Sequence, residues 1–406
     1  MFSESSYQGD EAISPLVGFM APLFSPSLDA AAFVLPIVLA LALTPYAIAG
    51  ARDAVPLWAH FSLVVCVDVA HVYASAFRTY LDHRELLRRP RLLAMAPPAA
   101  AAASFALHHL VSPSAFWSAL SYYAIFHFVK QNFGLVALFA ARARPSRARM
   151  ALEKYTVYAG AAFPVLLWHA SPADAFDWFH GGERFLFTTP PALLLPLRLG
   201  YCLAAAHYVA WEAWYYRQGH ALNLGKLFVM GCTWLTWGVG TRCEHEVLSL
   251  SFLNLFHGIP FIVMVGVYCR NKWATLPPAA CSDRLVRLLT RRWHLFVPCL
   301  VCLALLEDLL WDAFVWRAYA PALARAYAPS LAPPELGELA TSVAVALLSV
   351  PQIVHYALDA YIWRFDGSNP GLKEYLLGVP TDKAAAKAAA ADERTAPSEG
   401  PPPADE

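Results

Sequence analysis

Histidines in the apolar segments of this chain recur with a second polar side chain about one helical turn away. These sets are Asp68 with His71, His127 with Lys130 and Gln131, Asn254 with His257, and His355 with Asp359. Spacings of three or four residues place two side chains on the same face of a helix. Ionisable groups inside a membrane cost about 3 kcal/mol each or more, so they usually face the protein interior and mark a site. The pattern predicts a metal centre or a proton path inside a helical bundle.

The histidines and carboxylates of these sets are the candidate metal ligands, because metal centres in helical bundles use such ligands projecting inward from several helices. We predict a metal site built from Asp68, His71, His127, His207, His257, His355 and Asp359. His207 differs from the other histidines because Glu212 lies five residues on, more than one turn away. Imidazole together with carboxylate suits iron, zinc, manganese or copper and does not choose among them.

Other polar residues near these histidines have different predicted roles. Gln131 and Asn254 are predicted cofactor-binding residues that act indirectly, by orienting an imidazole. An ammonium beside a metal cation is unfavourable, so Lys130 is expected to pair with a carboxylate, to bind an acidic group of a substrate or to act in a proton relay. Lys130, Tyr123 and Tyr356 form the predicted catalytic set beside the metal ligands.

The elements that carry these residues are expected to be membrane-spanning helices. The 406 residues are 58% hydrophobic and 15% charged, with a mean hydropathy of +0.43, which is typical of a multi-pass membrane protein. Apolar stretches of spanning length lie at residues 31–49, 55–77, 92–111, 115–140, 152–170, 193–216, 224–240, 247–269, 294–316 and 339–363. The predicted fold is an all-α, polytopic transmembrane bundle of about ten helices.

The distribution of basic residues predicts the orientation of this bundle. Most of the 30 lysine and arginine residues lie in alternate connections and the C-terminal segment, at 78–91, 142–154, 217–226, 270–292 and 364–394. Because basic loops stay on the cytoplasmic side, both termini are predicted to be cytoplasmic, in a multi-pass protein of the bacterial inner membrane. We divide the chain into an N-terminal segment 1–30, a transmembrane domain 31–380 and a disordered tail 381–406, whose Lys-Ala and Pro-rich composition is low in apolar residues.

With this topology, the helices that carry the candidate ligands all run in the same direction. The ligands then differ in depth by roughly 10 Å at most at 1.5 Å per residue, so convergence on one site is expected. Pro260 lies three residues after His257, and Pro351 lies four residues before His355. Each proline is expected to kink its helix beside the site.

Other chemistries leave no recognisable pattern in the sequence. The first 30 residues contain no lysine or arginine, so the basic start of a secretory signal is missing. The pair Cys299 and Cys302 has metal-like spacing but lies in an apolar segment without a second pair, and we assign it to packing. A haem-attachment motif, a phosphate-binding P-loop and a nucleophile elbow are absent from the sequence, and no nucleic-acid partner is predicted.

The placing of several histidines across hydrophobic helices resembles the integral-membrane di-iron oxygenases, hydroxylases and desaturases. It also resembles the membrane-bound carotenoid-cleaving dioxygenases of the Brp/Blh type. The HxxxH and HxxHH boxes of the desaturases are absent, and the segment 351–364 looks like one found in uncharacterised bacterial multi-pass membrane proteins. The resemblance implies one or two iron ions as cofactor, although another transition metal would suit the same ligands.

Two functions are compatible with these residues. The first is a membrane-embedded, metal-dependent oxidoreductase or oxygenase that acts on a lipophilic small molecule, with membrane lipids and an electron-donor protein as further partners. The second is a proton- or ion-coupled transporter in which the same histidines, carboxylates and Lys130 form a relay between proline-kinked helices. Metal content separates the two functions.

Overall fold

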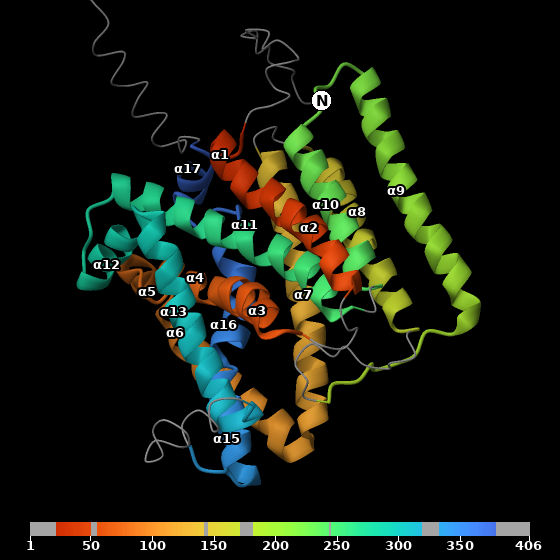
Figure 1. Cartoon of the computed structure of the whole chain (residues 1–406). Helices are drawn as coiled ribbons and strands as arrows, with labels where there is room; N and C mark the ends of the chain where they lie inside the picture. Colours follow the sequence, from red (N-terminus) through yellow and green to blue (C-terminus); the bar gives the residue numbers. More distant parts are fainter. Residues whose placement is uncertain are drawn as a thin grey trace, which may run out of the picture.

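The computed structural model describes residues 22–49, 55–141, 145–170, 182–242, 245–318 and 333–378. Every regular secondary-structure element in these ranges is a helix, so the predicted all-α class is confirmed for the described part of the chain (Figure 1). The predicted disordered tail 381–406 and most of the predicted N-terminal segment 1–30 lie outside the described residues.

Helical segments occupy each of the apolar stretches found in the sequence. The long ones, in chain order, are α1 Pro26–Asp29 continuing through η1 Ala30–Val34 into α2 Leu35–Ala49, α3 Leu57–Ala59 continuing through η2 His60–Val69 into α4 Ala70–Arg78, α6 Pro90–Phe105 with η3 Ala106–Val111, α7 Pro113–Ala140, α8 Arg147–Trp168, η5 Pro191–Leu193 with α9 Leu194–Arg217, α10 Leu224–Gly240, α11 Glu246–Thr275, α13 Trp293–Trp311 with η6 Asp312–Trp316, and α15 Glu338–Leu348 followed by α16 Val350–Ile362. Three short helices, α5 His83–Arg88, α12 Cys281–Thr290 and α17 Leu372–Leu377, lie in the connections.

Some of these segments have the length and apolar composition needed to cross a membrane. By these two criteria there are 6 in the described residues: Pro26–Ala49, Leu57–Arg78, Pro191–Arg217, Glu246–Thr275, Trp293–Trp316 and Glu338–Ile362. Many large apolar side chains on them are exposed, among them Leu199 and Leu203 of α9. An exposed apolar surface of this extent is expected where lipid, and not water, covers the protein.

Helix α11 forms the centre of the molecule, and α9 lies at its edge (Figure 1). Of the most apolar 18 residues of α11, 89% are buried, compared with 11% in α9. Helix α11 packs against α2, α4, η2, α10, α12 and α17, whereas α9 packs mainly against α8. A helix that is apolar on all sides is expected at such a central position. A histidine on α11 is therefore buried in the protein, and one on α9 can face outward.

The start of α7, which carries His127, is defined by its sequence. Ser112 is the N-cap, and its Oγ accepts a hydrogen bond from the backbone N–H of Ala115 at 3.0 Å. Pro113 follows at the first helical position, where its missing N–H costs no hydrogen bond. The helix then continues without interruption for 28 residues to Ala140.

Two of the helices that carry the candidate ligands are irregular close to them. The ten residues of η2, which include Asp68, are π-helical, and the chain returns to α-helix at Ala70, directly before His71. The kink expected at Pro351 is found as a break at Ser349, between α15 and α16. In contrast, α11 continues through Pro260. Such π segments are often found at functional sites, where they rotate the side chains that follow.

A buried ionic cluster joins α4 to the start of α6. The carboxylate of Glu85, 2% exposed, pairs with Arg78 at 2.7 Å, with Arg89 at 3.0 Å and with Arg88. Burial alone would raise the pKa of the Glu85 carboxyl, but these guanidinium groups outweigh it and hold the pKa below its ordinary value. Asn369 accepts hydrogen bonds from the same arginines, so the cluster also fixes the chain that follows α16.

Candidate metal centre

Four histidines from four different helices meet in the interior of the bundle. They are His71 of α4, His127 of α7, His257 of α11 and His355 of α16. One ring nitrogen from each lies within 4.8 Å of the corresponding nitrogens of the others. Each side chain is at most 3% exposed. The convergence expected from the sequence is therefore present for these histidines.

Their Nε2 atoms face one another in two close pairs. The Nε2 atoms of His71 and His257 lie 3.0 Å apart, and those of His127 and His355 lie 3.1 Å apart. Nitrogens bound to one metal at 2.0–2.1 Å in a tetrahedral site lie about 3.3 Å from each other, so both separations fit the edge of a coordination sphere. Four neutral imidazoles in this arrangement could hold one metal ion.

The four rings are not equally spaced. Neighbouring ring centroids form a closed cycle, at 4.5 Å for His71 and His257, 5.0 Å for His257 and His127, 4.6 Å for His127 and His355, and 4.8 Å for His355 and His71. Across the cycle, the centroids of His71 and His127 are 6.4 Å apart. The arrangement is therefore flatter than a regular tetrahedron, in which all spacings would be equal.

Close contact between two backbones brings His257 up to His71. A Cβ atom added to Gly258 would lie 2.6 Å from Cγ1 of Val67 and 2.8 Å from its carbonyl oxygen. Only glycine therefore allows α11 to approach η2 so closely. The residue next to Gly258 is His257 and the residue next to Val67 is Asp68, so this contact sets the distance between the two halves of the site.

Polar groups surround the outer edges of the rings. The Oγ of Ser75 lies 2.6 Å from Nδ1 of His355, and Oδ1 of Asp68 lies 3.6 Å from Nδ1 of His71. Asp359 lies between two histidines, with Oδ1 at 3.7 Å from Nδ1 of His355 and Oδ2 at 4.0 Å from Nε2 of His127. Groups at Nδ1 fix the tautomer in which Nε2 faces a metal. Both carboxylates thus lie beside the four-histidine group, and Asp68 contacts its outer edge.

Aromatic side chains pack against the histidine rings. The Phe128 ring stacks on His257 with centroids 3.6 Å apart, and the Tyr356 ring stacks on His127 at 4.3 Å. Phe261 contacts His355 edge-on at 5.1 Å. The phenol of Tyr356 accepts a hydrogen bond from Nε2 of Gln352 at 2.6 Å. These rings hold the imidazoles in place and keep the surroundings apolar.

The structure does not bring His207 to this group. His207 is exposed on α9, while Tyr208 and Glu212 are buried toward the protein. Glu212 pairs with Lys226 at 2.7 Å and with Arg149, and Tyr208 donates to Glu153. Tyr208 and Glu212 lie on the face of α9 that packs against the protein. Because successive helical residues are about 100° apart, His207, directly before Tyr208, points away from this face. His207 therefore lies outside the group formed by the other four histidines.

Among the described residues, neither predicted orienting residue has a hydrogen bond to an imidazole. Nε2 of Gln131 donates a hydrogen bond of 2.6 Å to the backbone carbonyl of His257, so it fixes the helix and not the ring. Asn254 is buried one turn before His257, but Nδ1 of His257 has no hydrogen-bond partner among the described residues. The tautomer of His257 is thus not set by either side chain.

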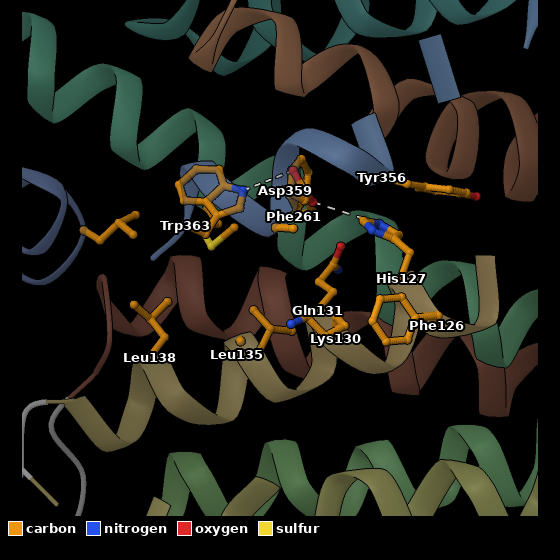
Figure 2. Close-up of a pocket in the computed structure, with 14 residues that line it drawn as sticks. Phe126, His127, Lys130, Gln131, Leu135, Leu138, Phe261, Tyr356, Asp359 and Trp363 are labelled. Atoms are coloured by element: carbon orange, nitrogen blue, oxygen red, sulfur yellow. Dashed lines mark hydrogen bonds and ion pairs between the residues drawn. The ribbon is translucent and has the colours of Figure 1, made fainter. Parts of the chain in front are cut away.

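Two of the predicted catalytic residues, Lys130 and Tyr356, lie beside His127 (Figure 2). Tyr356 stacks on His127, and Tyr123 packs edge-on against Tyr356 with ring centroids 5.2 Å apart. Lys130 and Tyr356 line a cavity that also includes His127 and Asp359. Figure 2 shows Asp359 between Trp363, which donates to it from Nε1, and His127.

Sequence reasoning missed the groups that complete the site. Ser75 follows His71 by four residues, a spacing of the same kind as the other pairs, and this signal could have identified it. Phe128, Phe261 and Gly258 carry no such signal, because phenylalanine and glycine are common in apolar helices and only their neighbours reveal their roles.

No family model, no curated protein and no solved structure matches the chain. What can be stated comes from its own fold and site. The described part of the chain is all-helical, with helices apolar enough to span a membrane and a buried group of four histidines that could bind a metal.

Proposed function

We propose that the protein is a membrane-embedded, metal-dependent oxygenase, with iron as the metal and a lipophilic small molecule as substrate. The observation that carries this proposal is the convergence of four buried imidazoles, whose Nε2 atoms face one another at 3.0 and 3.1 Å. Uncharged imidazoles suit iron, zinc, copper or nickel. A closed zinc site would have four equally spaced ligands, so the flattened arrangement of the rings supports a metal with further coordination positions.

The residues around the histidines would prepare the site for this chemistry. Bound iron would supply the redox capacity that dioxygen chemistry requires. With Nε2 of His355 turned toward the metal, its Nδ1–H donates to Oγ of Ser75, and the Nδ1–H of His71 points toward Asp68. Phe128 and Phe261 exclude water, which protects reactive species from side reactions.

The substrate would reach the histidines from the membrane. The cavity beside His127 is lined mostly by apolar side chains, and the surrounding helices expose apolar surface. A lipophilic molecule is the class of ligand that such a pocket binds. Ten spans with both termini in the cytoplasm of a bacterial cell remain part of this proposal, because the basic connections alternate along the sequence. By length and composition, 6 of the described helices meet the spanning criteria. An electron-donor protein would then bind at the basic, cytoplasmic face.

Metal analysis and optical spectroscopy of detergent-purified protein test the proposal. We expect stoichiometric iron in the wild-type protein and its loss in His127→Ala and His355→Ala. His207→Ala is the matched control, since this histidine is exposed on α9 and is expected to leave the iron content unchanged. Protein that stays free of metal when produced with ample iron would contradict the proposal and favour the transporter, in which the same histidines carry protons.

A further inference from the structure

A cavity of about 110 Å³ begins at His127 and runs along one side of α7. Its walls come from α7, α11, α16 and α17, together with Trp363 just after α16 (Figure 2). Most of the lining is apolar: Phe126, Gly134, Leu135, Leu138, Phe261, Met264, Tyr356, Ala360, Trp363 and Leu376. The polar side chains that line it are His127, Lys130, Gln131 and Asp359.

The lining residues of α7 give the cavity the shape of a groove. Phe126, Lys130 and Gly134, each four residues apart, are exposed and form its open edge, whereas His127 and Leu138 are buried at its inner wall. From His127 to Leu138 the helix rises roughly 16 Å, so the groove is long and narrow. A Cβ atom added to Gly134 would meet no atom within 4 Å, which confirms open space at the middle of the groove.

Lys130 is the positively charged group in this groove, and the described residues provide it with no counter-ion. Its Nζ lies 5.8 Å from the centroid of the Phe126 ring. The carboxylate in the same cavity, Asp359, is engaged by Trp363, His127 and His355. An ammonium held beside apolar side chains is costly unless an anion accompanies it.

We propose that this groove binds a lipophilic molecule with one acidic head group, a long-chain carboxylate. The carboxylate pairs with Lys130, and the hydrocarbon chain lies along Leu135 and Leu138 toward Leu376. Lys130 is three residues from His127, about 4.5 Å along the helix axis, so the acid end of the ligand lies nearest to the histidine group. That this ligand is the substrate rests on the proposed oxygenase function. That the groove binds it rests on the residues of the groove alone.

The test compares a carboxylic acid with its uncharged ester. The full chain is placed in phosphatidylcholine nanodiscs, and binding of hexadecanoic acid and of methyl hexadecanoate is measured by tryptophan fluorescence. We expect the acid to bind wild-type protein about tenfold more tightly, the effect of one charge-assisted contact. Lys130→Gln should remove this preference and Lys130→Arg should keep it. Gly134→Leu should weaken binding of both ligands, because the new side chain fills the groove.

Equal binding of acid and ester to the wild-type protein, or an unchanged preference in Lys130→Gln, would overturn the proposal. Nanodiscs that contain phosphatidylglycerol identify the source of the acid. Competition by this lipid would assign the groove to an anionic phospholipid and overturn the carboxylate, whereas its absence supports a free carboxylic acid. Iron content is measured in the same samples. If the protein prefers the acid but contains no iron, the oxygenase proposal is contradicted and the proposal of acid binding in the groove is supported. If it contains iron but does not prefer the acid, the binding proposal is contradicted and the oxygenase proposal is supported.

Discussion

The Nε2 atoms of His71 and His257 lie 3.0 Å apart, although 186 residues separate the two histidines in the chain. Two features of the backbone create this contact. The π-helical turns of η2 end just before His71, and Gly258 lets α11 touch the backbone of Val67. The site is thus held by helix packing, and a change in packing alone should disturb it.

Gly258→Ala tests this dependence on packing. The added methyl group would overlap the side chain and carbonyl oxygen of Val67, and a backbone atom cannot move aside cheaply. We expect a loss of about 1–3 kcal/mol in stability, seen as a lower unfolding temperature in detergent, together with weaker metal binding. The matched control is Gly231→Ala in α10, where an added Cβ meets no atom within 4 Å. A Gly258→Ala protein as stable and as metal-rich as this control would show that the close approach is not needed.

Ser75→Ala tests the hydrogen bond at the outer edge of His355. Its Oγ lies 2.6 Å from Nδ1 of this histidine, and loss of such a partner lowers metal affinity about 10–100-fold. Competition with a chelator measures that affinity. Ser121→Ala is the control, because Ser121 is also buried but donates to the backbone carbonyl of Trp117. Equal affinity in the two variants would exclude an orienting role for Ser75.

Asn substitutions decide whether the two carboxylates bind the metal directly. Asp68 lies 3.6 Å from the outer nitrogen of His71, and Asp359 lies 4.0 Å from Nε2 of His127. With four histidines as the ligands, Asp68→Asn and Asp359→Asn should keep stoichiometric metal at saturation, with affinity lowered about 10–100-fold. His257→Ala should lose it. Metal absent from either Asn variant would show that a carboxylate is itself a ligand.

The four histidines could be predicted from the sequence because each one lies in an apolar stretch, where a polar side chain needs an interior partner. The same rule also selected His207, but helix α9 packs mainly against α8, and His207 is exposed on its other side. Periodicity identifies a helix and its spacing, but it does not say which face meets the protein and which meets lipid. That information comes from the packing of α8 and α10 against Glu212.

The partners of Gln131 and Lys130 could not be predicted for a related reason. Both follow His127 by about one turn, so both were expected near its ring. A single residue step turns the side chain by about 100°, which sends Gln131 to the backbone of α11 and Lys130 to the open edge of the groove. Sequence spacing therefore predicted that Gln131 and Lys130 lie near His127, but their partners depend on how α7 packs against the other helices.

The ionic cluster around Glu85 predicts how stability depends on pH. The guanidinium groups of Arg78, Arg88 and Arg89 hold the pKa of this carboxyl below its ordinary value in spite of its burial. The unfolded chain, with a pKa of about 4.3, then takes up a proton more readily than the folded protein. The carboxylate therefore stabilises the fold fully above about pH 4.3, and this contribution is lost as the pH falls through the lower, folded-state pKa.

Glu85→Gln should remove this contribution and leave Arg78, which is 0% exposed, without its carboxylate partner. We expect a loss of about 3–5 kcal/mol at neutral pH, because an unpaired buried charge remains. In acid, the unfolding temperature of the variant should fall less steeply than that of the wild-type protein, since the group that takes up the proton is gone. Glu338→Gln, at an exposed helix start, is the control and should follow the wild-type curve. If Glu85→Gln also followed that curve, the cluster would contribute nothing to stability, and α16 would be attached to α4 by its other contacts, such as that of His355 with Ser75.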